Sequence, residues 1–239
     1  MVNIFNDYDL GQKLNFSYTN NKPFPNIVLD DFIDSNVAHK CFYELKQFNE
    51  WGHDPSDYVK NHQVNKFFIP WDFESLKYLK QSAPTVYNTL HYFNSESFLQ
   101  FLRNLTGIKN LIGDPTFEGG GCHKIHSGGK LSLHVDYNFN SKNQFRVLNF
   151  LLYLNPNWEE EWEGALELWD KKEKKCTHKI FPLFNRAVIF TLSDHSIHGH
   201  PIPLNCPEYI QRYSLALYYF VEEPNHEIYE KRSVVWHDI

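Results

Sequence analysis

The sequence is poor in cysteine and contains no closely spaced cysteine pair. Its four cysteines, Cys41, Cys122, Cys176 and Cys206, lie far apart, and no CxxC motif occurs. A zinc knuckle or a disulfide framework requires cysteines at short, regular spacings, so neither is expected to organise this chain. We therefore expect the cysteines to be reduced thiols without a structural role.

The chain also lacks an excess of basic residues and any long apolar run. It has 23 Lys and Arg against 29 Asp and Glu, a net charge of −6 and a pI near 6.1. The basic residues are scattered, so binding to nucleic acid or to an anionic membrane is not indicated. No apolar run is long enough to cross a bilayer, and residues 1–10 lack the layout of a signal peptide. We expect a soluble, cytoplasmic protein.

Aromatic residues, in contrast, are abundant, at 17% of the chain. Phe, Tyr and Trp suit a core built from strands, and they would equally suit the apolar walls of a pocket. A chain of 239 residues is long enough to bury one sizeable core. We expect a single domain.

The pattern up to residue 114 indicates a short strand followed by helices. Residues 26–32 indicate the strand, and a helix is expected to begin near Asp34 or Ser35, because apolar residues then recur at helical spacing. Two further helices are expected over residues 84–93 and 95–105. Residues 51–73 mix polar and aromatic side chains with glycine and proline, which predicts a long loop.

Beyond Pro115 the pattern changes to short strands separated by turn signals, such as residues 119–121 and 155–157. Turns at such regular spacing favour a β-sandwich or a barrel. The expected fold class is α+β and mainly β, with an N-terminal helical and lid region over residues 1–114. The β core is expected over residues 115–222, followed by a C-terminal tail over residues 223–239.

The stretch LHVDYN places an imidazole and a carboxylate two residues apart in a predicted strand. Successive side chains of a strand point to opposite faces, so His134 and Asp136 share one face. Alone, such a pair is most simply a solvated face. A third metal-capable side chain, His198, follows the strand predicted over residues 187–191 and its short polar extension. Two histidines and one carboxylate form the facial triad of non-haem Fe(II) oxygenases, whereas structural zinc sites more often use four ligands.

A buried cation is predicted in the last strand of the core. In the run RYSLALYYF, Arg212 and Ser214 point to the same side of the strand. A guanidinium inside an apolar core needs an anion, and its planar fork suits a carboxylate. A local aspartate or glutamate could supply that carboxylate, and a small-molecule ligand could supply it as well.

The order of motifs HxD, YLN, GxLELW, HGHP and RxSLALYYF resembles that of the Fe(II)- and 2-oxoglutarate-dependent dioxygenases, in their prolyl-4-hydroxylase-like branch of bacterial and phage type. The resemblance covers about residues 115–220 and implies a double-stranded β-helix, or jelly-roll and cupin-like, core. It also implies that His134, Asp136 and His198 hold Fe(II) and act in catalysis. Arg212 and Tyr153 are then expected at the C5 carboxylate of 2-oxoglutarate, where Ser214 is expected to add a hydrogen bond.

The resemblance implies an oxygenase that uses O2 and 2-oxoglutarate, releases succinate and CO2, and hydroxylates an aliphatic C–H bond. The implied substrate is a prolyl residue in a peptide or a small metabolite. By analogy with relatives that close a loop over substrate, the candidate lid residues are Tyr58, Lys60, His62 and Lys66. The alternatives are a catalytically inert jelly-roll binding module and a zinc-loaded cupin-like hydrolase. Neither alternative requires a buried cation placed for a dicarboxylate.

Several further histidines could approach the same site. His200 competes with His198 as the distal ligand, and the family pattern favours the histidine that precedes glycine, which is His198. His195 is expected at the surface or behind the ligands. His123 and His126 lie upstream of the triad, where one could face the cosubstrate or substrate, although a hydrogen-bonded structural histidine is the commoner outcome.

Four other positions are not expected to contribute to the site. Trp169 could face it, but a buried core tryptophan is the default. Gly164-Ala165 replaces the Gly-Gly that is usual in relatives, and a single arginine, Arg146, stands where relatives often have two. These departures are expected to touch neither the triad nor Arg212.

Overall fold

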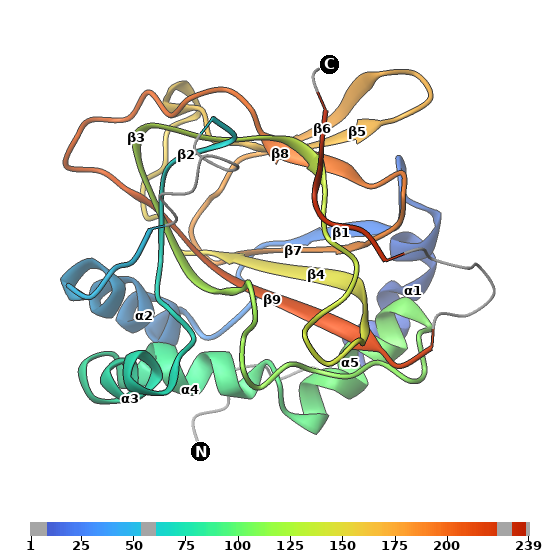
Figure 1. Ribbon diagram of the computed structural model, residues 1–239, viewed down its shortest axis with the longest axis horizontal. Helices are drawn as coiled ribbons and strands as arrows, with labels where there is room; N and C mark the ends of the chain where they lie inside the picture. The colour runs from blue at the N-terminus through green and yellow to red at the C-terminus, as the bar shows by residue number, and fades with distance from the viewer. Residues whose placement is uncertain (1–8, 54–60, 224–230, 238–239) are drawn as a thin grey trace.

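The computed structural model describes residues 9–53, 61–223 and 231–237 (Figure 1). The helices are α1 (Leu10–Asn20), α2 (Ser35–Gln47), α3 (Phe73–Ser82), α4 (Pro84–Tyr92) and α5 (Glu96–Thr106), with a short 3-10 helix at Glu160–Trp162. The expected helix start near residue 34 is confirmed, because the Asp34 carboxylate accepts hydrogen bonds from the backbone N–H groups of Asn36 and Val37. Helices α4 and α5 also lie where the sequence predicts them.

The strands are β1 (Asn26–Leu29), β2 (Gln63–Phe68), β3 (Gly121–Val135), β4 (Phe145–Tyr153), β5 (Leu166–Asp170), β6 (Lys175–Ile180), β7 (Arg186–Thr191), β8 (Ile197–His200), β9 (Arg212–Val221) and β10 (Val235–Trp236). Their pairings are antiparallel and follow the order β1-β7-β4-β9-β3-β8-β5-β6. Strands β2 and β10 each pair with β3 outside this path. The prediction of a loop over residues 51–73 is wrong at β2, which is held by its pairing with a distant strand.

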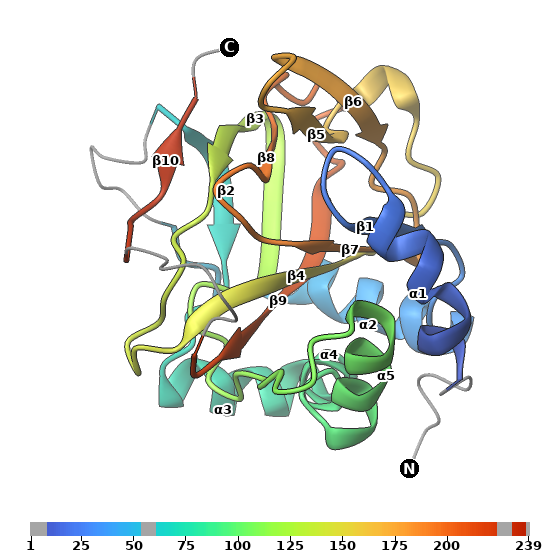
Figure 2. The ribbon, with the colours of Figure 1, turned by 90° about the vertical axis from the view of Figure 1, so that its right-hand side faces the viewer.

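The sheet folds into two layers that share β3. The first part of β3 pairs with β9, and its last part pairs with β8. Strands β1, β7, β4 and β9 form one layer, and β8, β5 and β6 form the other (Figures 1 and 2). The change of partner occurs beyond Gly128-Gly129, where a Cβ on Gly129 would lie only 2.4 Å from the Ile125 side chain. Glycine therefore permits the close bend that lets one strand serve both layers.

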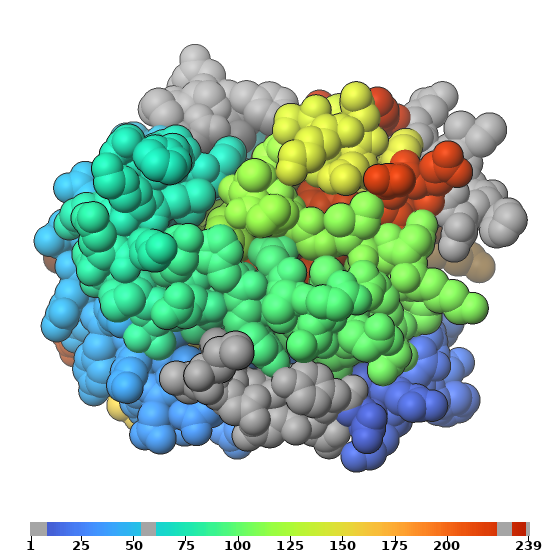
Figure 3. Space-filling model, turned by 90° about the horizontal axis from the view of Figure 1, so that it is seen from below, coloured from blue at the N-terminus to red at the C-terminus, as the bar shows by residue number. Residues whose placement is uncertain are grey.

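Helices α2 to α5 cover the outer face of the layer that contains β4 and β9 (Figure 2). Viewed from below, residues of α3, α4 and α5 occupy most of that face of the molecule (Figure 3). Within the described part of the chain, every helix is too short or too polar to span a membrane.

The contact between these helices and the sheet is made by packed aromatic rings. Phe98 of α5 is fully buried, and its ring centroid lies 4.8 Å from that of Phe93, 5.3 Å from that of Phe150 on β4 and 6.2 Å from that of Phe32. Aromatic pairs at such separations stabilise a core beyond the area that they bury. Phe98 thus joins the helical layer to the sheet.

We expect Phe98→Ala to lower the free energy of unfolding by about 3–5 kcal/mol, because a fully buried aromatic ring would leave a cavity that its neighbours fill only in part. The matched control is Phe16→Ala on α1, where the ring is 78% exposed, and its effect should stay within about 0.5 kcal/mol. Urea denaturation followed by circular dichroism measures both. Equal stability losses in the two variants would contradict this account of the core.

Candidate metal centre and anion site

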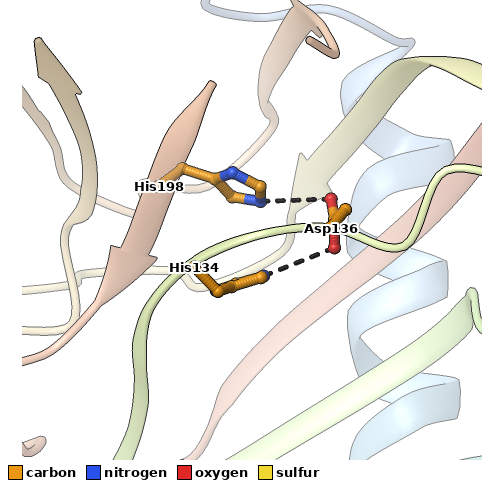
Figure 4. A group of neighbouring side chains, drawn as sticks. All are labelled: His134, Asp136 and His198. Carbon is orange, nitrogen blue, oxygen red and sulfur yellow. Dashed lines mark ion pairs between the residues drawn. The ribbon is translucent and has the colours of Figure 1, made fainter. Parts of the chain in front are cut away.

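Two paired strands bring the predicted metal ligands together. His134 lies on β3 directly opposite His198 on β8, and Asp136 follows the end of β3. One oxygen of Asp136 lies 3.3 Å from His134 Nε2, and the other lies 3.3 Å from His198 Nε2 (Figure 4). The three candidate ligand atoms all lie within 4.8 Å of one another, and all three residues are buried. The structure therefore places a facial set of two imidazoles and one carboxylate at a single point.

His198 reaches this point from a strand of its own. The sequence predicts it at the end of an extension of the strand over residues 187–191, and that detail is wrong. β7 ends at Thr191, and a turn, in which Ser196 Oγ donates a hydrogen bond to the Ser193 carbonyl, leads into the separate strand β8. The turn carries the chain from the helix-covered layer to the opposite layer, which places His198 across from His134.

Backbone carbonyl groups fix the orientation of both imidazoles. His134 Nδ1 lies 2.8 Å from the Ser132 carbonyl, and His198 Nδ1 lies 2.9 Å from the Ser196 carbonyl. A carbonyl oxygen can only accept, so each Nδ1 carries a proton and each Nε2 is the ring atom that faces Asp136. Burial, reinforced by the nearby His198, lowers the pKa of His134. Two imidazoles that turn their Nε2 atoms toward one carboxylate fit a divalent transition metal, which would bind each imidazole in its neutral form.

A closed hydrogen-bond network holds the Asp136 carboxylate. Asp136 Oδ2 accepts hydrogen bonds from Arg146 Nη2 at 2.9 Å and from Asn149 Nδ2 at 2.8 Å. The Asn149 side-chain oxygen in turn accepts from Arg146 Nε at 3.0 Å and from Arg146 Nη2 at 2.7 Å. Burial alone would raise the pKa of Asp136, but the charge of Arg146 and the adjacent histidines outweigh it and hold that pKa well below its ordinary value. The carboxylate is thus ionised and oriented.

These contacts correct one expectation from the sequence. Arg146 was expected to be remote from the triad, yet it donates directly to a candidate ligand, Asp136. Gly164 was expected to be remote from Arg212, yet its carbonyl accepts a hydrogen bond from Arg212 Nε at 2.9 Å. Asn149 was not singled out at all. The sequence did offer a signal for both residues. An arginine and an asparagine stand in an otherwise apolar predicted strand, and such side chains need hydrogen-bond partners once they are buried.

A cavity of about 140 Å³, here called the central cavity, connects the triad with the second predicted feature, Arg212. Arg212 is 4% exposed, and burial lowers its pKa. Its guanidinium carbon lies 4.8 Å from the centroid of the Tyr153 ring. Within the described residues, no carboxylate forms an ion pair with Arg212, so the alternative of a local acidic partner finds no support there.

Tyr153 and Ser214 lie where the sequence predicts them, at the Arg212 end of the central cavity. The Tyr153 hydroxyl is buried and makes no hydrogen bond of ordinary geometry with the described part of the protein. Burial raises the pKa of Tyr153, while the charge of Arg212 opposes that rise, so the hydroxyl remains a donor. Ser214 is also buried. A guanidinium, a phenol and an alcohol thus converge without an acidic partner from the described chain, which suits the carboxylate of a ligand.

Of the other four candidate histidines, two line the central cavity and two do not. His123 and His200 are buried and line the central cavity, whereas His195 is exposed and His126 is half-buried against the Phe67 ring. His198, and not His200, offers a nitrogen within 4.8 Å of the candidate ligand atoms of His134 and Asp136. The geometry therefore favours His198 over His200 as the distal ligand.

Trp169, expected as a buried core residue, is only half-buried. It packs beside Leu133, Val135 and Ile197, and its indole N–H donates to Glu167.

The segment predicted as a tail contributes to the site. Trp236 of β10 pairs with His134, and its ring stacks on that of His62 at 4.2 Å between centroids. A strand of two residues has no periodicity, so the sequence could not have indicated it. Of the candidate lid residues, Lys66 lines the central cavity and His62 meets Trp236, whereas Tyr58 and Lys60 lie outside the described residues.

Comparisons with known proteins agree with this geometry. Residues 120–220 match the family model described as the 2OG-Fe(II) oxygenase superfamily. Mouse (Mus musculus) prolyl 3-hydroxylase OGFOD1 is 26% identical over 180 residues, which are 74% of this chain and 29% of the relative. The chain thus spans less than a third of the length of this curated relative.

Solved structures share the fold at low sequence identity. A prolyl hydroxylase from Trichoplax adhaerens, in complex with a peptide fragment of the hypoxia inducible factor oxygen degradation domain, has a TM-score of 0.56, 22% identity and 90% coverage of both chains. A prolyl-4-hydroxylase from Pseudomonas putida has a TM-score of 0.57 and 14% identity, with 90% of this chain and 100% of that chain covered. HygX from Streptomyces hygroscopicus, with nickel, 2-oxoglutarate and hygromycin B bound, has a TM-score of 0.53 and 14% identity, with 82% of each chain covered. These likenesses confirm the expected double-stranded β-helix core.

The network around Asp136 generates the first prediction for the site. We expect Asn149→Leu to lower the affinity for Mn(II) by about tenfold to a hundredfold, because the substitution removes a donor that orients a ligand. Isothermal titration calorimetry measures this, with Asn20→Leu, an exposed residue of α1, as the matched control that should leave affinity unchanged. Identical Mn(II) affinities in the two variants would refute the orienting role.

Proposed function

We propose that this chain, whose residues 120–220 match the 2OG-Fe(II) oxygenase superfamily, is an Fe(II)- and 2-oxoglutarate-dependent hydroxylase. In this proposal His134, Asp136 and His198 hold the metal, and Arg212, Tyr153 and Ser214 hold the distal carboxylate of the cosubstrate. When bound, iron supplies the redox chemistry that consumes O2, converts 2-oxoglutarate to succinate and CO2, and leaves one oxygen atom in a C–H bond of the substrate.

One observation carries this proposal: a metal-binding triad and a buried arginine without an acidic partner among the described residues face the same cavity. A dicarboxylate can meet both, with one end at the metal and the other at the guanidinium. An inert binding module has no need of two oriented imidazoles beside a carboxylate, and a zinc hydrolase has no need of the cation. The combination therefore favours the oxygenase over both alternatives.

The residues of the chain prepare the site for this reaction. Leu151, Leu166 and Phe190 give the central cavity apolar walls, and Trp236 lies against His134 at its edge. Such walls exclude water from the reacting groups and strengthen the polar contacts inside. The Asp136 carboxylate also occupies the position at which a smaller residue would leave room for a halide, so hydroxylation is the favoured outcome.

An open groove beside the central cavity supports a peptide substrate. The outer groove has a volume of about 330 Å³ and is lined by Trp71, Glu118, Gly119, Tyr137, Phe139, Arg232 and Ser233. Gly119 and Tyr137 line both the outer groove and the central cavity, so the two spaces adjoin. An aromatic groove next to the metal can hold the residues that flank a target side chain. We therefore propose a prolyl residue in a peptide as the substrate, with a small metabolite as the second candidate.

We also propose, from the sequence pattern alone, a cytoplasmic location and no nucleic-acid or membrane partner. The division into a helical and lid region over residues 1–114, a β core over 115–222 and a tail over 223–239 likewise remains a prediction. In this division, β10 belongs to the tail and also lies at the site.

The triad generates a prediction about iron. We expect His134→Ala and Asp136→Ala each to abolish Fe(II) binding, measured anaerobically by calorimetry, and to abolish conversion of 2-oxoglutarate to succinate, because a facial site that loses one ligand no longer retains the metal. His195→Ala, an exposed histidine away from the central cavity, should match the parent. Unchanged succinate formation in either ligand variant would remove the triad assignment.

The anion site generates a prediction about the cosubstrate. Removing one partner of a buried charged pair costs about 3–5 kcal/mol, so we expect Arg212→Ala to weaken 2-oxoglutarate binding by about two to four decades and to leave Fe(II) affinity nearly unchanged. Tyr153→Phe removes one donor to a charged group and should cost about 1–2 kcal/mol.

The metal-to-ligand charge-transfer band of the anaerobic Fe(II) protein, followed during titration with 2-oxoglutarate, measures both effects. Arg212→Lys is the control for charge alone. It should bind 2-oxoglutarate better than Arg212→Ala and worse than the parent, because an ammonium group cannot reproduce the planar fork. If Arg212→Ala binds 2-oxoglutarate as tightly as the parent, the cosubstrate assignment fails.

A further inference from the structure

His200 is a buried imidazole whose hydrogen-bonding groups are unused. Its side chain is 3% exposed, and neither ring nitrogen has a hydrogen-bond partner in the described part of the structure. Buried polar groups are nearly always paired, and one left unpaired typically costs about 1–3 kcal/mol. His200 lines the central cavity, so a molecule bound there could supply the missing partner.

The strand geometry places His200 on the cavity side of β8. It follows His198 by two residues, so both side chains point to the same face of the strand. Its backbone pairs with Leu131 of β3, away from the end of that strand where His134 and Asp136 meet the metal. The ring of His200 lies outside the group of close ligand atoms. His200 is therefore in the cavity and is not one of the candidate metal ligands.

The electrostatic surroundings of His200 include the anion site. Arg212 lines the same cavity as His200. An imidazole carries at least one N–H donor whether it is neutral or protonated. A carboxylate bound by Arg212 can only accept, so it would pair with the N–H of His200.

Within the proposed function, on which this inference rests, we propose that His200 donates a hydrogen bond to the distal carboxylate of 2-oxoglutarate. It thereby selects a dicarboxylate over a 2-oxo acid that ends in a methyl group. A second donor without an acceptor in the described chain, the O–H of Tyr153, lies beside Arg212 at the same end of the cavity. The distal carboxylate would then satisfy donors from β4, β8 and β9 at once.

The test compares two ligands that differ only at their distal end, 2-oxoglutarate and 2-oxopentanoate, each titrated into anaerobic Fe(II) protein. His200→Leu should weaken 2-oxoglutarate binding by about tenfold to a hundredfold, the equivalent of one hydrogen bond to a charged group. The same variant should bind 2-oxopentanoate within about twofold of the parent. His200→Gln retains an N–H donor and should recover part of the lost 2-oxoglutarate affinity.

His126→Val is the matched control, because His126 lies on the adjacent strand β3 and does not line the central cavity. It should leave both affinities unchanged. Unaltered 2-oxoglutarate binding by His200→Leu would overturn the proposal. Equal losses for both ligands would overturn it as well, since they would show a change of cavity shape instead of a lost contact with the carboxylate.

A measurement on the parent protein requires no variant to fold. In spectra of Zn(II)-loaded protein labelled with 15N-histidine, 2-oxoglutarate should protect one additional imidazole N–H from exchange, and 2-oxopentanoate should not. Protection by both ligands, or by neither, would contradict the contact. If the parent itself binds no 2-oxoglutarate, the proposed function fails, and this outcome is distinct from a failure confined to His200.

Discussion

The burial of one carboxylate, that of Asp136, is the constraint on which the site depends. An ionised carboxylate inside a protein is stable only if neighbouring charges and hydrogen-bond donors compensate for lost hydration. Arg146 and Asn149 provide that compensation from β4, and the two imidazoles approach from β3 and β8. The network therefore ties three strands from both layers to one point. A divalent metal would complete the same compensation, since it adds positive charge between the ligands.

The two buried arginines of the central cavity differ in how their charges are balanced. Arg146 is matched by Asp136 and packed over Tyr218, with its guanidinium carbon 3.2 Å from the centroid of that ring. Arg212 meets a backbone carbonyl and the Tyr153 ring, and no described carboxylate balances its charge. The charge of Arg146 is thus balanced within the described chain, and in the proposed function the distal carboxylate of 2-oxoglutarate balances that of Arg212. This asymmetry supports a cavity with a metal end and an anion end, which would orient an elongated dicarboxylate.

The sequence predicts the parts of this site that follow from strand periodicity and misses those that depend on distant pairing. The alternation of side chains was sufficient to place His134 and Asp136 on one face and to direct Arg212 inward. Strands β2 and β10 were missed because they are short and become regular only through pairing with the distant β3. Helices α1 and α3 were missed because few of their residues are buried, so their apolar periodicity is weak. The contact of Arg146 with Asp136 was missed for a related reason, since Asp136 follows β3, Arg146 lies on β4, and β9 stands between these strands in the sheet order, which no local pattern reveals.

Strand β3 sets the distance between the two ends of the cavity. Near its start Ile125 pairs with Arg212, and near its end His134 pairs with His198. One continuous strand therefore separates the anion site from the metal site, and the bend at Gly128-Gly129 lets that strand change partners in between. The separation is fixed by backbone geometry, whereas the side chains at each end determine which groups are recognised. In the proposed function, the β3 backbone thus sets the length of an acceptable cosubstrate, and Arg212 and the donors beside it select its charge.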